Sequence, residues 1–301
     1  MLQHQLGEVR IDRIVESEEP NFDPLAFFPA TTAEDWAPYQ DWLQPHPGNP
    51  ALGYLTLTLQ SYLLRTRHHN ILVDTCIGDH KTRQGTYTPP SWHQSTGGVL
   101  LRKLALAGLR PEDIDYVMCT HLHSDHVGWN TRLVNGRWVP TFPNAKYIMS
   151  ARDLAHLESV HRKAPMVHFE DSVLPVMQSG QAMLVANDHA LDDEVCLEST
   201  PGHTPDHVCV RVTSGGHRAV ITGDLMHSPV QVAEPGWMPR FDLDPVAAAQ
   251  TRLSFLERHS EAHSLVCGTH FPSPSFGHIA ERGGRFQFVD ALPAARRVTD
   301  P

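Results

Sequence analysis

Three histidines and one aspartate occupy six consecutive positions near the middle of the chain, His121-Leu122-His123-Ser124-Asp125-His126. Neutral imidazoles bind zinc, iron, nickel and copper, and an added carboxylate suits a hard or borderline divalent ion. Side chains two residues apart on an extended segment point to the same side, so His121 and His123 can hold one ion. Asp125 and His126 follow after a turn and can face a second ion close by.

The alternative is a chance cluster of surface histidines, because the chain holds 21 histidines in 301 residues. Chance pairs are expected at that frequency. Four ligand-type side chains in six positions, directly after an apolar segment that ends at Cys119, are much rarer. The pattern therefore favours a metal site.

The same arrangement recurs along the chain, because short apolar segments end at further ligand-type residues with glycine or threonine beside them. The expected strands are residues 114–119, 195–198, 219–222 and 265–267. Open α/β sheets place their sites in the loops at the carboxyl ends of strands. The series predicts seven ligands for two ions at one rim of a sheet, namely His121, His123, Asp125, His126, His203, Asp224 and His270.

The remaining elements are read from periodicity and helix signals. Residues 54–74 alternate like a hairpin, and Asp74 at its end is either a partner that orients a metal-bound imidazole or a loop cap. Helices are expected at residues 95–107 and 151–162, with a loop-rich stretch to Gln181. Asp244 and Pro245 form an N-cap and first position for a helix that runs to about His259.

Residues 1–50 are expected to form an N-terminal arm that contributes to the pocket or to a dimer contact. Asn21 to Pro50 is rich in Pro, Trp and Phe without a clear period, and it is expected to be irregular, with a short helix at Thr32 to Trp42. Residues 51–301 are expected to form a single catalytic domain.

Composition narrows the class of protein. Hydrophobic residues make up 41% and charged residues 19%, which is typical of a globular chain. The net charge of −10 argues against a nucleic-acid partner, and no apolar stretch reaches the roughly 20 residues that span a bilayer. Five scattered cysteines without a C-x-x-C pair, and an N-terminus without an apolar signal segment, predict a cytoplasmic protein.

The ordered series of ligand residues resembles the metallo-β-lactamase-fold superfamily of metallohydrolases, from about Gly53 to about His278. The resemblance implies an α+β fold, an αββα sandwich of two mixed β-sheets with helices on both outer faces. It implies that His121, His123 and His203 hold one metal and that Asp125, His126 and His270 hold the other. Asp224 would bridge both ions.

Within the superfamily, three sequence segments resemble most the branch that contains lactonases and methyl parathion hydrolase-like organophosphatases. They are Thr200-Pro-Gly-His-Thr-Pro205, Gly223-Asp-Leu-Met-His227 and Thr269-His-Phe-Pro272 with Gly277-His278. Acyl-homoserine lactonases carry a tyrosine three residues beyond the bridging aspartate. His227 stands there in this chain, as expected for the organophosphatase-like group, so no tyrosine at that place can assist the leaving group.

The expected activity is hydrolysis of small, apolar lactones, carboxylic esters or phosphotriesters by a metal-bridging hydroxide. Two adjacent cations lower the pKa of bound water from about 16 towards about 7. Zinc is the expected metal, with manganese, cobalt and iron as alternatives, and the resemblance implies a homodimer. The expected catalytic residues are Asp125, Asp224 and His227, with His227 either contacting substrate or structural. The expected pocket residues are Trp129, Met226, Trp237, Phe271 and His278, although each alone is more often a core residue.

Two other activities of the same fold stay open. One is a persulfide dioxygenase, an oxidoreductase with a single iron, which metal count and identity would distinguish. The other is a thioesterase of the glyoxalase II type, for which the sequence lacks an obvious cationic cluster. His207, four residues after His203, is predicted to be a hydrogen-bonding or core histidine and not a ligand.

Overall fold

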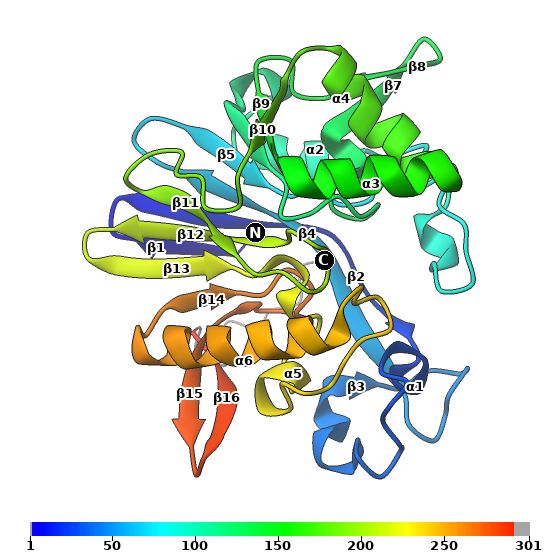
Figure 1. The fold of residues 1–301 in the computed structure, drawn as a ribbon, viewed down its shortest axis with the longest axis vertical. Helices are drawn as coiled ribbons and strands as arrows, with labels where there is room; N and C mark the ends of the chain where they lie inside the picture. The colour runs from blue at the N-terminus through cyan, green and yellow to red at the C-terminus, as the bar shows by residue number, and fades with distance from the viewer. Residues whose placement is uncertain (1, 292–301) are drawn as a thin grey trace.

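Two β-sheets packed face to face form the centre of the computed structural model, which describes residues 2–291 (Figure 1). The larger sheet runs in the order β1-β2-β4-β5-β6-β9-β10, with β3 paired to β4. Its strands are β1 (Gln3–Leu6), β2 (Val9–Phe22), β3 (Leu43–Gln44), β4 (Tyr54–Arg65), β5 (Asn70–Val73), β6 (Tyr116–Met118), β9 (Lys146–Ser150) and β10 (Ala182–Val185). The strands from β5 to β10 pair in parallel and the others antiparallel, so the sheet is mixed.

The smaller sheet runs from β11 to β16 in chain order. Its strands are β11 (Val195–Ser199), β12 (Val208–Ser214), β13 (His217–Ile221), β14 (Leu265–Cys267), β15 (Phe276–Arg282) and β16 (Arg285–Asp290). Only β13 and β14 pair in parallel, so this sheet is mixed as well. A separate hairpin joins β7 (Thr131–Val134) to β8 (Arg137–Pro140).

Helices cover the outer face of each sheet, as the sequence predicts for an αββα sandwich (Figure 1). The larger sheet carries α2 (Val99–Leu106), α3 (Ala151–Lys163) and α4 (Leu174–Gln178), and the smaller carries α6 (Pro245–Glu261). Two single-turn helices, α1 (Pro24–Phe27) and α5 (Val230–Ala233), lie in the connecting segments. Within residues 2–291, no helix is both long and apolar enough to cross a membrane. The predicted fold class is confirmed.

Alternation along the strands builds the two kinds of core. On β4, Tyr62 and Leu64 face the second sheet and pack in one cluster with Val210, whereas Leu63 packs in another cluster with Leu104 of α2. Successive side chains of a strand point to opposite faces, so a strand buried on both sides reads as a nearly continuous apolar run. The alternation predicted from residue 54 onward is therefore confirmed as a strand, although β4 is buried on both faces along most of its length.

The predicted capped helix that begins at Pro245 is confirmed by α6, whereas the prediction of a loop-rich stretch after α3 is wrong. Asp244 caps α6, because its side chain accepts a hydrogen bond from Ala247 N at 3.0 Å, and Pro245 is the first helical residue. The stretch to Gln181 is not loop-rich, since it holds a π-helical turn at Phe169–Val173 followed by α4. Pro175 lies in the first turn of α4, where proline is compatible with a helix.

Residues 1–20, to which the sequence assigns no element, hold two strands of the larger sheet. β2 pairs with β4 from Arg10 to Phe22, with register shifts after Val15 and Pro20. Buried charges conceal the strand pattern, because Asp12 is fully buried between Arg10 and Arg65 at 2.7 and 3.1 Å. The second half of the arm is irregular as expected, with a short 3₁₀ turn at Ala37–Trp42.

Glu16 on β2 forms hydrogen bonds to two loops, one before and one after the segment of residues 121–126. Its carboxyl group accepts hydrogen bonds from Ile77 N at 2.9 Å and from Trp129 Nε1 at 2.5 Å. Burial raises the pKa of Glu16 to about 7, although these hydrogen bonds oppose the shift. The neutral acid is therefore favoured in the folded state over a wider pH range than in the unfolded chain.

We expect Glu16→Gln to stabilise the protein at high pH, because it keeps an acceptor and removes the buried charge. With a folded pKa of about 7 against 4.5 unfolded, the wild type loses stability as pH rises through this window. Gln keeps one of the two acceptors, which adds a cost independent of pH, and the difference between variant and wild type should shift in favour of the variant by roughly 2–3 kcal/mol between pH 4.5 and pH 7 in denaturant unfolding. Glu19→Gln, at an exposed position of β2, is the control. An advantage independent of pH would contradict the assignment.

Candidate metal centre

Asp224 lies at the point where the loops of both sheets converge. Its Oδ1 is 2.9 Å from the Nε2 atoms of both His126 and His270. Its Oδ2 is 3.2 Å from His203 Nε2 and 3.6 Å from His121 Nε2. The two carboxylate oxygens therefore face two different pairs of imidazoles, which is the arrangement that a bridging carboxylate requires.

The structure brings all seven predicted ligands into two adjacent groups. Within each group the ligand atoms lie within 4.8 Å of one another. The first group is His121, His123, His203 and Asp224, and the second is Asp125, His126 and His270. This division is the one that the resemblance implies, with Asp224 also contacting the second group through Oδ1.

Three of the imidazoles, those of His126, His203 and His270, are oriented by a partner on their outer nitrogen. His126 Nδ1 donates to Asp74 Oδ2 at 2.9 Å, and Asp74 also accepts from the Thr120 backbone and hydroxyl at 2.8 Å. Asp74 is thus an orienting partner and not a simple loop cap. His203 Nδ1 donates to Asp242 Oδ1 at 2.9 Å, and His270 Nδ1 donates to the carbonyl of Thr58 at 2.9 Å. Such partners fix the tautomer and point the Nε2 lone pair inward.

The inward atoms fit two divalent cations. His126 Nε2 and His270 Nε2 are 3.2 Å apart, and His203 Nε2 is 3.0 Å from His123 Nδ1. Because Nδ1 of His126 and of His270 carries the proton that each donates outward, their neutral Nε2 atoms present lone pairs to each other, so a cation or a proton must lie between them. Among the described residues, His121 Nε2 has no hydrogen-bond partner. An all-nitrogen-and-oxygen donor set of this kind suits zinc and similar ions.

The pKa values show that the centre attracts positive charge. Burial alone would lower the pKa of His203, but Asp224 and Asp242 raise it to about 9. Burial likewise opposes the shift at His126, where Asp224 and Asp74 raise the pKa well above its ordinary value. Burial would raise the pKa of Asp224, but the surrounding histidines, led by His126 and His270, hold it far below its usual range. The centre therefore holds an ionised carboxylate surrounded by groups that bind protons or metal.

Two glycines allow the ligand loops to turn closely. Gly202 has φ +135°, and a Cβ there would lie 2.3 Å from the backbone nitrogen of Ala248 in α6. Gly223 has φ +51°, and a Cβ there would lie 2.6 Å from His207 Nε2. Glycine is therefore required directly before His203 and directly before Asp224.

His207 is confirmed as a hydrogen-bonding histidine. Its Nδ1 contacts Thr200 Oγ1 at 2.8 Å, and its Nε2 accepts a hydrogen bond from the backbone nitrogen of Asp224 at 2.9 Å. It is fully buried and belongs to neither ligand group. His207 therefore stabilises the loop that carries Asp224 through this backbone hydrogen bond.

His227 lies against the same carboxylate, with Nε2 at 3.1 Å from Asp224 Oδ2. Its ring is parallel to that of His270 at 5.5 Å and meets the edge of Phe27 at 5.3 Å. Within residues 2–291, its Nδ1 has no hydrogen-bond partner. His227 is therefore in the centre, between the ligands and the aromatic N-terminal segment.

The structure separates the five predicted pocket residues. Trp237 packs on Trp36 at 4.8 Å in the aromatic cluster that also contains Phe27. Trp129, Met226 and Phe271 are buried in the hydrophobic cores behind the sheets.

We correct the pocket interpretation for three of these residues and for His278. Trp129 donates its ring N–H to Glu16, and Met226 and Phe271 pack in the hydrophobic cluster under α6. His278 is exposed on β15 and bonds the carbonyl of Ser264, at the opposite end of β14 from His270.

Sequence reasoning missed Asp242, the Thr58 carbonyl and Phe27. Asp242 reaches His203 because backbone hydrogen bonds from Leu243 and Asp244 join its loop to residues 202–203 at 3.1 and 2.9 Å. The carboxylate at 242 stands two residues before a recognisable N-cap, which is the only signal that marks that loop. The contact of His270 with the Thr58 carbonyl could not be predicted from residue types, because every residue has a backbone carbonyl.

Comparison with known proteins agrees with this geometry. The model of the metallo-beta-lactamase superfamily matches residues 59–270. An N-acyl homoserine lactonase of Bacillus cereus is 27% identical over 247 residues, which cover 78% of this chain and 85% of the lactonase.

Two solved structures share the fold at low identity. AidC, a dizinc quorum-quenching lactonase in complex with a product, superposes with a TM-score of 0.77 at 19% identity, covering 97% of each chain. The hydrolase AbOPH of the beta lactamase superfamily also gives 0.77, at 22% identity, covering 96% of this chain and 97% of AbOPH.

We expect Asp224→Ala to remove bound metal, because the substitution deletes the carboxylate whose two oxygens face both imidazole groups. Metal per chain should fall by half or more in elemental analysis after gel filtration, and hydrolysis should fall at least about 100-fold. Asp188→Ala, at an exposed position, is the matched control. Full metal content and activity in the Asp224 variant would contradict a bridging role.

Proposed function

Because the chain belongs to the metallo-beta-lactamase superfamily, we propose that it is a binuclear metal hydrolase of small, apolar esters. The observation that carries the proposal is the position of Asp224, whose two oxygens contact the imidazoles of two separate ligand groups. Lactones are the first substrate class to test, since the curated relatives named above are lactonases. Carboxylic esters and phosphotriesters share the same requirement for attack at a polarised centre.

The proposed ligand assignment follows the two groups. His121, His123 and His203 would hold one ion, Asp125, His126 and His270 the other, and Asp224 both. When bound, the ions would supply an acidified water and a Lewis acid for the carbonyl or phosphoryl oxygen. Asp74, Asp242 and the Thr58 carbonyl keep the imidazoles aimed, so the chain supplies a preorganised centre.

The exposed side of the centre indicates where a substrate arrives. Five of the seven ligands are buried, whereas His123 and Asp125 are half-buried. A substrate therefore reaches the centre past these two side chains.

The aromatic segment supports an apolar substrate. Phe27 contacts both His227 and Phe241 at 5.3 Å between ring centroids, and the Arg240 backbone nitrogen donates to the Phe27 carbonyl at 2.9 Å. The N-terminal segment and the loop after α5 thus form one aromatic wall next to the ligands. Such a wall would bury the apolar part of an ester.

We assign His227 a substrate-contacting role. Its Nε2 is held by Asp224, while its Nδ1 stays without a partner in the described part of the chain. A buried polar atom without a partner costs free energy, so a group of the substrate is its expected partner. With Nε2 donating to the carboxylate, Nδ1 of the neutral ring would accept a hydrogen bond from an N–H or O–H group of the substrate.

A hydrolysis panel tests the proposed activity. The metal-loaded protein is assayed with a γ-lactone, an acyl-homoserine lactone, a p-nitrophenyl ester, a phosphotriester and a glutathione thioester. We expect turnover of at least one of the first four, with loss on chelation and recovery with zinc. Activity confined to the thioester would favour the glyoxalase II type, and oxygen consumption with a persulfide instead of hydrolysis would favour the dioxygenase.

Replacing His227 with phenylalanine should lower kcat about 10- to 100-fold and leave metal content near that of wild type. The reason is that the imidazole contacts Asp224 but belongs to neither ligand group. Elemental analysis and initial rates on the same preparation give both quantities. His217→Phe, at an exposed position of β13, is the control. Loss of metal together with activity would show that His227 supports the ions.

A further inference from the structure

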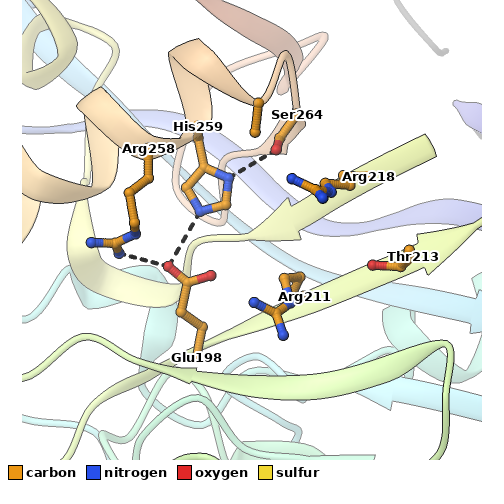
Figure 2. Close-up of a pocket in the computed structure, with 8 residues that line it drawn as sticks. Glu198, Arg211, Thr213, Arg218, Arg258, His259 and Ser264 are labelled. Atoms are coloured by element: carbon orange, nitrogen blue, oxygen red, sulfur yellow. Dashed lines mark hydrogen bonds and ion pairs between the residues drawn. The ribbon is translucent and has the colours of Figure 1, made fainter. Parts of the chain in front are cut away.

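Apart from the candidate metal centre, a cavity lies on the outer face of the smaller sheet, at the C-terminal end of α6. Its volume is about 330 Å³. Strands β11, β12 and β13 form its floor, and the end of α6 with the turn after it forms its wall (Figure 2). The lining residues are Glu198, Arg211, Thr213, Arg218, Arg258, His259, Ala262 and Ser264. None of these residues belongs to the candidate metal centre.

Glu198 organises one side of this cavity. Its Oε1 accepts from Arg258 Nη2 at 2.7 Å and contacts His259 Nε2 at 3.3 Å, while His259 Nδ1 contacts Ser264 Oγ at 2.9 Å. Burial would raise the pKa of Glu198, but these hydrogen bonds lower it to about 2, so the carboxylate stays ionised. Both hydrogen bonds use Oε1, which leaves Oε2 available to a donor from the cavity.

Arg211 and Arg218 form the other side and lack such partners. They sit on adjacent strands of one face, since Arg211 pairs with Val220 and Arg218 pairs with Thr213. No hydrogen bond or ion pair involves either guanidinium group among residues 2–291. Figure 2 shows both groups directed into the space in front of His259 and Glu198.

The charge of this cavity is opposite to that of the chain. Three arginines against one glutamate leave two positive charges in excess, although the chain carries a net charge of −10. Neighbouring like charges on one sheet face are destabilising unless something compensates them. Guanidinium groups bind phosphate and carboxylate oxygens with two parallel hydrogen bonds.

We propose that this cavity binds a hydroxylated phosphate monoester of the sugar-phosphate class. The phosphoryl group lies between Arg211 and Arg218, where Thr213 can add a hydroxyl donor. The ligand hydroxyls donate to Oε2 of Glu198, the carboxylate oxygen that Arg258 and His259 do not contact. The volume is at the lower end of small-molecule sites, which suits a ligand of this size.

Isothermal titration of the metal-loaded protein tests the site, with ribose 5-phosphate, inorganic phosphate and ribose as probes. We expect ribose 5-phosphate to bind more tightly than phosphate and ribose not to bind. The double variant Arg211→Gln/Arg218→Gln should bind ribose 5-phosphate at least about tenfold more weakly. Both arginines are exposed, so the variant is expected to fold, and its thermal unfolding is measured alongside.

The control is Arg162→Gln, which removes one positive charge from an exposed position of α3. It should leave binding unchanged. Phosphate bound at the metal centre would persist in the double variant and is distinguished in this way. Unchanged binding in the double variant, an equal loss in the control, or no binding to the wild type would overturn the proposal.

Discussion

The constraint on which the structure depends is the electrostatic requirement of one buried carboxylate. Asp224 is held in its ionised form by the surrounding histidines, and four imidazoles from three loops approach its two oxygens at 2.9 to 3.6 Å. Several of these imidazoles turn their outer nitrogens to acceptors, so their inner nitrogens face one another across short distances. Only positive charge between them makes this arrangement favourable, and two divalent ions supply it best.

The sandwich serves this requirement by bringing strand ends from both sheets to one rim. β6 of the larger sheet delivers residues 121–126, and β11, β13 and β14 of the smaller sheet deliver His203, Asp224 and His270. α6 joins the supports, because the buried Arg252 donates to the Leu225 carbonyl at 2.8 Å and contacts Asp242 at 3.4 Å. The outer helix thus holds both the loop that carries Asp224 and the carboxylate that orients His203.

The recurrence of ligand types directly after short apolar strands is visible in the sequence, and the resemblance to the metallo-β-lactamase superfamily that this series carries implies the sandwich and the division into two ligand groups. The sequence could not reveal what depends on long-range contact. Asp242 and the Thr58 carbonyl reach the centre only through tertiary packing. β2 was missed because ion pairs such as Asp12 with Arg65 replace its apolar alternation. Phe271 directly follows His270 and Met226 lies two residues after Asp224, yet both side chains pack in the core.

The number of metal ions per chain tests the account most directly. The protein would be purified without chelators and measured by elemental analysis, and then stripped and titrated with zinc while bound metal is counted. The account predicts about two divalent ions per chain, bound by two ligand groups that share Asp224. A single ion at saturation, or a single tightly held iron with no second site, would contradict the binuclear centre.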